Sequence, residues 1–432
     1  MNGVLTSRLP NGLTVLLQES HVAPVATFWV WYRVGSRNER PGLTGVSHWV
    51  EHMLFKGTPS HPAGTLTRLI DRLGGRWNAF TWKDYTAYFE VLPVEHLGVA
   101  VALEADRMVN AQFDPDVVAG ERTVIISERE GQENFPTYYL REEVEALAFK
   151  THPYRQPVIG WKSDLRAITR DDLYGHYRTY YHPSNAIAIA VGDFNADRTA
   201  ALIAETFGPI AAGEAPPAVR AEEPEQEGER RVVLRRPGGA TAYLQMAYHT
   251  PAASHPDLPA LLVADGILSG FKGISPFDGG GGGRSSRLYR ALVDTGLATD
   301  AGSGIVPSAD PSLLRIGATV RAGVEVQAVE DAVNTEIRRV QDEPVGPDEL
   351  ARVTRQARAQ FVYLRDGVFR RAMALGAFAA VDKPETLFAL ADGVERVSAD
   401  DVSRVARTYL ADRRRTVGWY LPEAGQAAVR AS

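Results

Sequence analysis

The sequence has 432 residues, of which 44% are hydrophobic and 23% charged, an ordinary composition for a folded protein with room for two or more domains. The net charge of −6 argues against nucleic acid as a partner. The absence of cysteine excludes disulfides, thiolate catalysis and cysteine-ligated metal sites, so any transition-metal site must use histidine and carboxylate ligands. With no run of about 18 apolar residues and no signal-peptide pattern, we expect no membrane partner and a cytoplasmic protein.

The first half of the chain mixes strand and helix patterns. Strands are predicted where β-branched and aromatic residues cluster, at 13–19, 25–35 and 85–92. Apolar periodicity predicts helices at about 43–57, 62–73, 95–110, 115–132, 138–149 and 170–180. This order favours an α+β fold, a mainly antiparallel sheet with helices packed on one face. A parallel doubly wound sheet is the alternative, and it fits less well because no glycine-rich phosphate loop follows the first strand.

An internal repeat divides the chain into two homologous domains. Residues 168–180, ITRDDLYGHYRTY, match residues 397–409, VSADDVSRVARTY, at a constant offset of 229. In both copies a Thr or Ser precedes an Asp by three positions, which is a helix N-cap arrangement, and an apolar strand follows. Residues 211–230 are rich in Ala, Glu and Pro without apolar periodicity, which indicates a linker. We therefore predict domains at 1–210 and 231–432.

A glycine-dense segment, residues 270–283, lies inside the second domain. A flexible surface loop is the simpler interpretation, and a mobile loop at the entrance of a cavity is the functional one. A phosphate cradle does not fit, because no Gly-Lys-Ser/Thr ends the segment.

Residues 48–52, His-Trp-Val-Glu-His, are the strongest chemical signal in the first half. His48 and His52 are four residues apart, so on a helix they share one face, and Glu51 points to the same side. Two imidazoles on one helical face suit zinc, and a neighbouring carboxylate can act on a zinc-bound water. Without a third ligand, two surface histidines on an ordinary helix remain the alternative.

The predicted helix 115–132 offers that third ligand. Asp114 can cap it, with Pro115 at the first helical position. Glu121 and Glu128 are seven residues apart and share a face, and the apolar residues between them indicate a partly buried helix. Either glutamate is therefore a candidate ligand, and two glutamates on a solvated edge are the alternative.

Seven segments spread over nearly the whole chain carry a family resemblance: LPNGLTVLLQES, GLTGVSHWVEHMLFKGT, LGGRWNAFTWKDYTAYF, ERTVIISERE, HPYRQPVIG, YHPSN and SSRLYRALVDTGLA. Together they resemble the pitrilysin/insulinase metallopeptidases, or inverzincins. Within that family the chain is most similar to the branch of mitochondrial processing peptidase and its bacterial homologues.

The resemblance assigns roles to the candidate residues. In the family the third zinc ligand follows the second histidine by 76 residues, which here is Glu128. The resemblance thus implies that His48, His52 and Glu128 bind zinc, that Glu51 is the general base, and that Glu121 is an auxiliary acidic residue of the catalytic site. It also implies that substrate adds as an extra β-strand along Asn78, Ala79, Phe80 and Thr81. A turn or strand-end role is the alternative for Asn78.

The second half departs from the family at one place. Active single-chain members carry an Arg and, seven residues on, a Tyr, in a segment like Arg-x-x-x-Gly-Leu-x-Tyr. Here Gly296, Leu297 and Ala298 match, but Thr299 stands at the Tyr position and Leu292 or Val293 at the Arg position. By resemblance, this chain is the zinc-bearing subunit of a dimer. Its partner is a homologous subunit that supplies Arg and Tyr, or a second copy of the chain.

The function predicted from the sequence is zinc-dependent endopeptidase activity on peptides or small unfolded polypeptides, with Zn²⁺ as the cofactor. The alternative is a non-catalytic structural or peptide-binding subunit of the same fold. An intact set of four zinc-site residues favours the enzyme.

Overall fold

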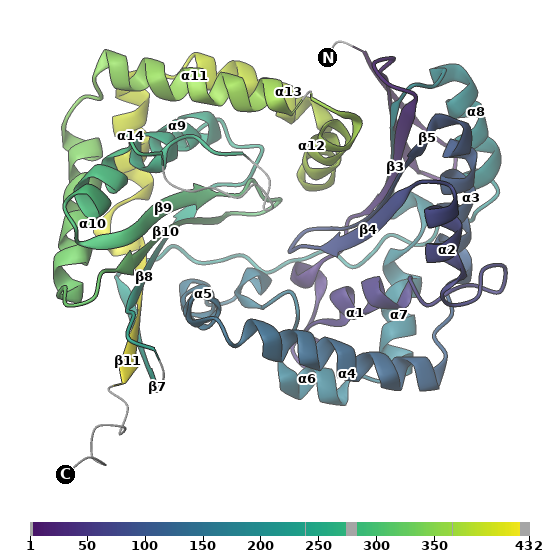
Figure 1. The fold of residues 1–432 in the computed structure, drawn as a ribbon, viewed down its shortest axis with the longest axis horizontal. Helices are drawn as coiled ribbons and strands as arrows, with labels where there is room; N and C mark the ends of the chain where they lie inside the picture. Colours follow the sequence, from purple (N-terminus) through teal and green to yellow (C-terminus); the bar gives the residue numbers. More distant parts are fainter. Residues whose placement is uncertain (1–2, 238, 274–282, 365, 424–432) are drawn as a thin grey trace. The chain divides into compact units, whose positions relative to one another are not determined.

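The computed structural model describes residues 3–237, 239–273, 283–364 and 366–423 (Figure 1). The chain forms two compact units. The first unit contains Met1–Glu130, Gln156–Ala221 and Leu364–Leu387, and the second contains Gly131–Arg155, Glu222–Tyr363 and Phe388–Ser432. These units interleave along the sequence, and the domain boundaries at 210 and 231 remain a prediction. In the predicted linker, residues 211–228 contain no helix or strand.

The sheet of the first unit has six strands in the order β1-β2-β6-β3-β5-β4. Their bounds are β1 Val4–Arg8, β2 Thr14–Glu19, β3 Val25–Tyr32, β4 Arg76–Thr81, β5 Thr86–Pro93 and β6 Ala186–Gly192. β2 and β6 are parallel, and every other neighbouring pair is antiparallel. The predicted α+β class with a mainly antiparallel sheet is therefore confirmed.

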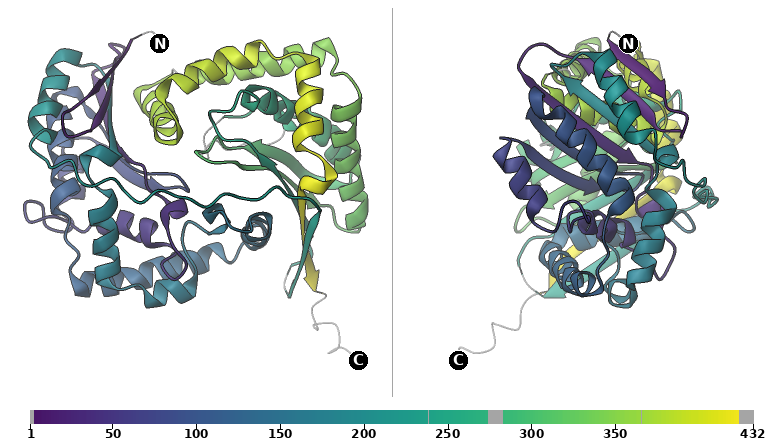
Figure 2. Two further views of the ribbon diagram at one scale, coloured as in Figure 1. Left: turned by 180° about the vertical axis from the view of Figure 1, so that it is seen from behind. Right: turned by 90° about the vertical axis from the view of Figure 1, so that its right-hand side faces the viewer.

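Successive side chains of β3 point to opposite faces of this sheet, and different helices cover the two faces (Figures 1 and 2). Phe28 points to the face covered by α3 (Leu97–Asn110) and α8 (Ala196–Phe207), where its ring lies 6.2 Å from that of Phe207. Trp29 and Trp31 point to the opposite face, which α12 (Val368–Val381) covers. The ring of Trp29 lies 5.1 Å from that of Phe369 on this helix. Helices thus lie on both faces of the sheet, whereas the sequence predicts them on one.

The remaining helices of the first unit surround one end of its sheet. Their bounds are α1 Val46–Met53, α2 Thr65–Arg72, α4 Pro115–Gln132, α6 Lys162–Ala167 and α7 Arg170–Tyr180. The predicted helices 115–132 and 170–180 agree with α4 and α7 at both ends.

The second unit repeats the strand arrangement of the first. Its five strands follow the order β7-β11-β8-β10-β9, and only β7 and β11 are parallel. Their bounds are β7 Arg230–Pro237, β8 Tyr243–Thr250, β9 Ala298–Ile305, β10 Ser312–Val320 and β11 Arg415–Glu423. Apart from the additional β1, the two sheets have the same order and the same single parallel pair. This agreement supports the duplication inferred from the sequence repeat.

The repeated segments form equivalent helices. α7 and α14 (Ala399–Tyr409) begin after Thr169 and Ser398, whose hydroxyls accept hydrogen bonds from Asp172 N and Asp401 N at 3.2 and 3.1 Å. α7 precedes β6 and α14 precedes β11, the two strands that enter the parallel pairs. The capped helices predicted from the repeat are therefore confirmed.

The second sheet is also covered on both faces. α5 (Pro136–Ala148) packs on one face, where Leu140 and Val144 belong to an apolar cluster that includes Ala247 and Tyr420. α9 (Leu258–Ser269), α10 (Val326–Asp342) and α14 are the helices of the other face. α11 (Pro347–Tyr363) packs on α9, and α13 (Pro384–Glu395) contains the unit boundary between Leu387 and Phe388.

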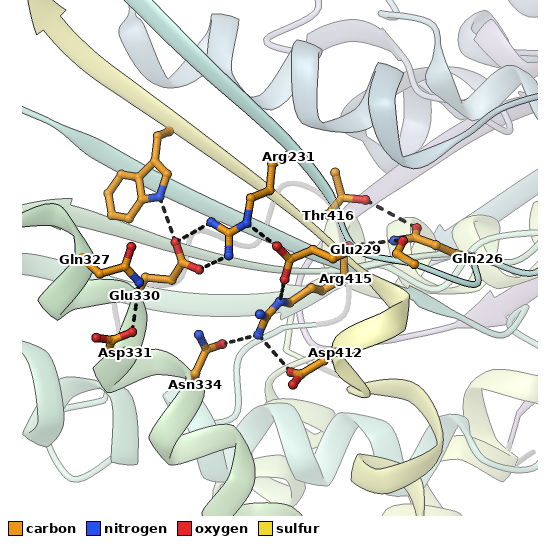
Figure 3. Close-up of polar contacts among 12 residues, drawn as sticks. Gln226, Glu229, Arg231, Gln327, Glu330, Asp331, Asn334, Asp412, Arg415 and Thr416 are labelled. Atoms are coloured by element: carbon orange, nitrogen blue, oxygen red, sulfur yellow. Dashed lines mark hydrogen bonds and ion pairs between the residues drawn. The ribbon is translucent and has the colours of Figure 1, made fainter.

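A network of charged and polar side chains joins β7, β11 and α10 in the second unit (Figure 3). Buried Glu330 on α10 accepts hydrogen bonds from Arg231 on β7 and, at 2.9 Å, from Trp419 Nε1 on β11. Glu229 pairs with both Arg231 and Arg415, and Arg415 donates to Asn334 at 2.9 Å. The network therefore fixes α10 across the parallel pair of strands.

The glycine-dense segment can be placed only in part. Its residues 274–282 lie outside the described residues, so both interpretations of that segment remain predictions. No described helix combines the length and the hydropathy that a membrane-spanning segment requires.

Candidate metal centre

The two histidines lie on one face of α1. Their ring centroids are 4.6 Å apart. The opposite side of the helix packs into the core through Val46, Trp49 and Val50, each at most 1% exposed. The helix begins three residues later than the predicted 43–57 because Gly45, at φ 88°, turns the chain immediately before it, and it ends at Met53, four residues before the predicted end.

The start of α1 is held by a carboxylate from outside the helix. Glu39, which is 5% exposed, accepts the backbone N–H groups of Gly45 at 2.7 Å and of Ser47 at 2.8 Å. Burial raises the pKa of Glu39 to about 8, although these two N–H donors oppose the rise. The hydroxyl of Ser47 also contacts His176 Nε2 on α7 at 3.1 Å. The backbone just before His48 is thereby fixed to two neighbouring elements.

α4 brings both candidate glutamates to α1. The side chain of Asp114 accepts Asp116 N at 2.9 Å and Val117 N at 3.2 Å, which confirms the predicted cap. Glu128 Oε2 lies 3.7 Å from the Nε2 atom of each histidine. Glu121 Oε1 instead lies 2.8 Å from Nδ1 of His52. The structure thus places the two glutamates at different nitrogens.

Within the described residues, His48, His52 and Glu128 form a group whose ligand atoms lie within 4.8 Å of one another. Neutral imidazole and carboxylate are ligands that suit zinc. Burial, and then the charge of His52, lower the pKa of His48 to about 3, so this imidazole is neutral at physiological pH. His48 Nδ1 is buried without a hydrogen-bond partner. The other ring nitrogen, Nε2, faces Glu128 Oε2. The donor set therefore fits a zinc ion.

Glu51 stands beside this group and is bonded to the edge of the sheet. Its side chain is 8% exposed, and its Oε2 accepts the hydroxyl of Thr81 at 2.7 Å. Burial raises the pKa of Glu51 to about 7, although the hydrogen bond from Thr81 lowers it. A carboxylate in that range can both accept and release a proton near neutral pH.

β4 carries the four residues predicted to contact substrate. It is the terminal strand of its sheet and, among the described strands, pairs only with β5. Thr81 faces α1, whereas the ring of Phe80 points to the other face and contacts Trp31 at 5.5 Å. Ala79 is nearly buried, and its N–H is bonded to the side chain of Asn78 at 2.9 Å. An extended substrate would therefore meet the backbone of this edge, while the four side chains alternate between its two faces.

Two residues near the site were missed by the sequence analysis. Lys56 Nζ lies 2.5 Å from Glu121 Oε2. Its position four residues after His52, on the same face of the predicted helix 43–57, was the available signal. Glu39 has no such signal, because its contacts with Gly45 and Ser47 depend on the path of the intervening loop.

The positions that match the family's Arg and Tyr belong to the second unit. Leu292 is fully buried, and Thr299 on β9 is exposed, with its hydroxyl 3.4 Å from Thr319 O. An aliphatic side chain donates no hydrogen bond. The side chains at the family's Arg and Tyr positions therefore differ from Arg and Tyr in hydrogen-bonding capacity as well as in residue type.

Comparisons with known proteins agree with this architecture. Residues 14–162 match the family model described as insulinase (peptidase family M16), and residues 167–357 match the model described as peptidase M16 inactive domain. The zinc protease PqqE of Helicobacter pylori is 28% identical over 422 residues, which cover 96% of this chain and 92% of that protein. An uncharacterized zinc protease of Mycobacterium tuberculosis is 31% identical over 310 residues, covering 71% and 68%.

Solved structures show the same fold. The crystal structure of a protease from Helicobacter pylori superposes with a TM-score of 0.91 at 26% identity, over 98% of this chain and 100% of that one. The peptidase M16 inactive domain from Pseudomonas fluorescens gives 0.86 at 19% identity, over 98% and 99%, and shows the likeness of fold alone. Because the two family models together match most of the sequence, and a relative with 31% identity is matched over two thirds of its length, this chain belongs to peptidase family M16.

Proposed function

We propose that this chain is a zinc-dependent endopeptidase that cleaves peptides or small unfolded polypeptides. The observation that carries the proposal is the approach of His48 Nε2, His52 Nε2 and Glu128 Oε2 to one point beside the buried Glu51. The names of the relatives, which are zinc proteases, support the same activity.

Each residue of the site has a chemical task in this proposal. His48, His52 and Glu128 would hold the zinc, which when bound supplies a Lewis acid that activates water and polarises the peptide carbonyl. Glu51 accepts the proton of the attacking water and passes it to the leaving amine. Thr81 orients the Glu51 carboxylate through its 2.7 Å hydrogen bond. β4, the terminal strand of its sheet among the described strands, would provide backbone groups that an extended substrate can pair with.

We further propose that a homologous subunit completes the site by supplying an Arg and a Tyr, a homodimer being the alternative. The proposal is supported by the side chains at these positions: Leu292 or Val293 has no donor, and the side chain of Thr299 is too short for its hydroxyl to reach where a Tyr hydroxyl would. The second candidate function, a non-catalytic structural or peptide-binding subunit, is favoured by the same absence. Assays of the isolated chain, and of the chain mixed with such a homologue, distinguish these cases. Equal turnover in both assays would refute the need for a partner.

The experiment that tests the activity compares the wild type with Glu51→Gln. Zinc content is measured by atomic absorption, and cleavage is measured on an unstructured peptide with the homologous subunit present. We expect about one zinc per chain in both proteins, and turnover in Glu51→Gln lower by about 10²-fold or more. A wild type that binds no zinc would refute the proposal, and so would a Glu51→Gln variant with undiminished turnover. Loss of zinc in Glu51→Gln would make Glu51 a ligand instead of a base.

A further inference from the structure

The choice between two glutamates on α4 has a physical cause in the structure. Glu121 and Glu128 are two helical turns apart on one face, and both reach α1. By charge and residue type, either one could bind a metal. Only Glu128 directs an oxygen toward the Nε2 atoms of both histidines.

Lys56 accounts for this difference. Its Nζ lies 2.5 Å from Glu121 Oε2, and the other oxygen of the same carboxylate lies 2.8 Å from Nδ1 of His52. Each oxygen of Glu121 therefore has its own donor. The Glu121 side chain is 7% exposed, so these two donors take the place of most of its hydration.

This pairing also orients the imidazole of His52. The carboxylate of Glu121 is ion-paired with Lys56 Nζ at 2.5 Å while its other oxygen faces Nδ1 of His52 at 2.8 Å. An ionised carboxylate can only accept, so His52 carries its proton on Nδ1. The lone pair of Nε2 then points toward Glu128, as metal ligation requires.

We propose that Lys56 is a positioning residue of the metal centre: by engaging the second oxygen of Glu121, it commits that carboxylate to His52 and leaves Glu128 as the carboxylate ligand. This inference rests on the proposed zinc function. Without Lys56, one oxygen of Glu121 loses its donor, and the carboxylate gains freedom to turn away from Nδ1. The His52 ring then loses the contact that fixes its orientation.

The test measures zinc affinity, without reference to turnover, by competition with a chromophoric chelator on the full-length chain. Lys56→Met is expected to weaken zinc binding by about 10-fold to 100-fold, the usual range for a group that orients a ligand. Lys56→Arg restores the charge and is expected to recover most of the affinity. The matched control is Lys162→Met, which removes a lysine paired with Glu130 on the same α4 at 3.3 Å and leaves affinity unchanged.

A double-mutant cycle separates positioning from a general structural role. If Lys56 acts through Glu121, then adding Lys56→Met to Glu121→Gln will produce little further loss of zinc affinity. Independent, additive losses would overturn the inference. Should Lys56→Met not fold, Lys56→Gln keeps a polar stem without the charge and enters the same cycle.

The outcomes also separate this inference from the proposed function. A wild type without zinc affinity would refute both. A wild type that binds zinc, together with a Lys56→Met variant that binds it equally tightly, would refute the positioning role of Lys56 alone.

Discussion

Replacing Glu39 with Ala is expected to destabilise the start of the helix that carries both histidines. Glu39 is the buried acceptor for the N–H groups of Gly45 and Ser47, at 2.7 and 2.8 Å. Gly45 has a left-handed backbone and offers no side chain of its own as a cap. The substitution removes the acceptor of two buried donors at once.

The magnitude follows from those two donors. A buried N–H left without a partner costs about 1–3 kcal/mol, so two cost about 2–6 kcal/mol before the loop relaxes or water enters. Typical domains have only about 5–15 kcal/mol of unfolding free energy, so the loss is a large fraction of the total. Zinc affinity is expected to fall as well, because His48 follows directly after the loosened turn.

Urea unfolding of the metal-free protein measures the stability change, and chelator competition measures the affinity. The comparison variant is Asp164→Ala, which removes the acceptor of Gly42 N and Thr44 N in the same loop. Asp164 also accepts the hydroxyl of Thr44 at 2.8 Å, but the cost of its substitution is expected to be smaller, because Asp164 is only partly buried and Gly42 is exposed, so water can replace the lost carboxylate. If Glu39→Ala unfolds at the same urea concentration as the wild type, Glu39 does not secure α1.

Three further outcomes are expected. Glu128→Gln should weaken zinc binding strongly and Glu121→Gln less, in chelator competition, and the reverse order would make Glu121 the direct ligand. Gly376→Ala should cost about 1–3 kcal/mol of unfolding free energy, because its Cβ would lie 2.1 Å from Trp31 Cε2; an unchanged urea midpoint would show that α12 can shift without penalty. Glu330→Ala should lower the unfolding free energy by about 1–3 kcal/mol, because it removes the acceptor of buried Trp419 Nε1. Salt screens the ion pair with exposed Arg231 but not the hydrogen bond from the neutral indole, so the loss should be the same in urea unfolding at high salt; a loss that disappears in high salt would show that the ion pair dominates.

Elements with chemical signals at their ends were predictable from the sequence. α4 and α7 begin where Asp114 and Thr169 cap them, and both predictions agree with the structure. α1 was predicted to start too early, because the apolar pattern extends back across the turn that Gly45 imposes. That turn depends on close approach: a Cβ at Gly45 would lie 2.5 Å from Ile159 O. No local pattern reports a contact so distant in sequence.

Contacts between segments that are distant in the sequence were the second reason why parts of the fold could not be predicted. β4 has no strand pattern of its own, and its segment was identified only by family resemblance. α12 lies on the face of the first sheet that holds Trp31, although it is more than 330 residues away in the sequence. The sequence analysis made no prediction for the segment of α12, and no local pattern in it tells which sheet would bury the helix. Pattern analysis therefore recovered the type of the elements that it named, nearly all of them in the first half of the chain, and missed how distant segments pair.

Comparing the two duplicated units shows which features of the candidate metal centre belong to the shared fold and which are found in the first unit alone. In the first unit, Glu51, on the helix that follows β3, is bonded to Thr81 on the edge strand β4. In the second unit, Asp265, on the helix that follows β8, is bonded to Ser303 on the edge strand β9. Both carboxylates are buried, and burial raises the pKa of each, to about 7 and about 6.

A carboxylate bonded to an edge-strand hydroxyl is thus present in both units, whereas α9 carries no histidine. The pairing of Glu51 with Thr81 cannot by itself mark a catalytic site, because the described residues around its counterpart form no group of metal ligands. The pairing holds the helix against the edge strand in either unit. What converts it into a candidate for proton transfer in the first unit is the adjacent His48, His52 and Glu128 group. In the proposed function, chemistry at this position therefore depends on three candidate ligand side chains added to a framework that both units share.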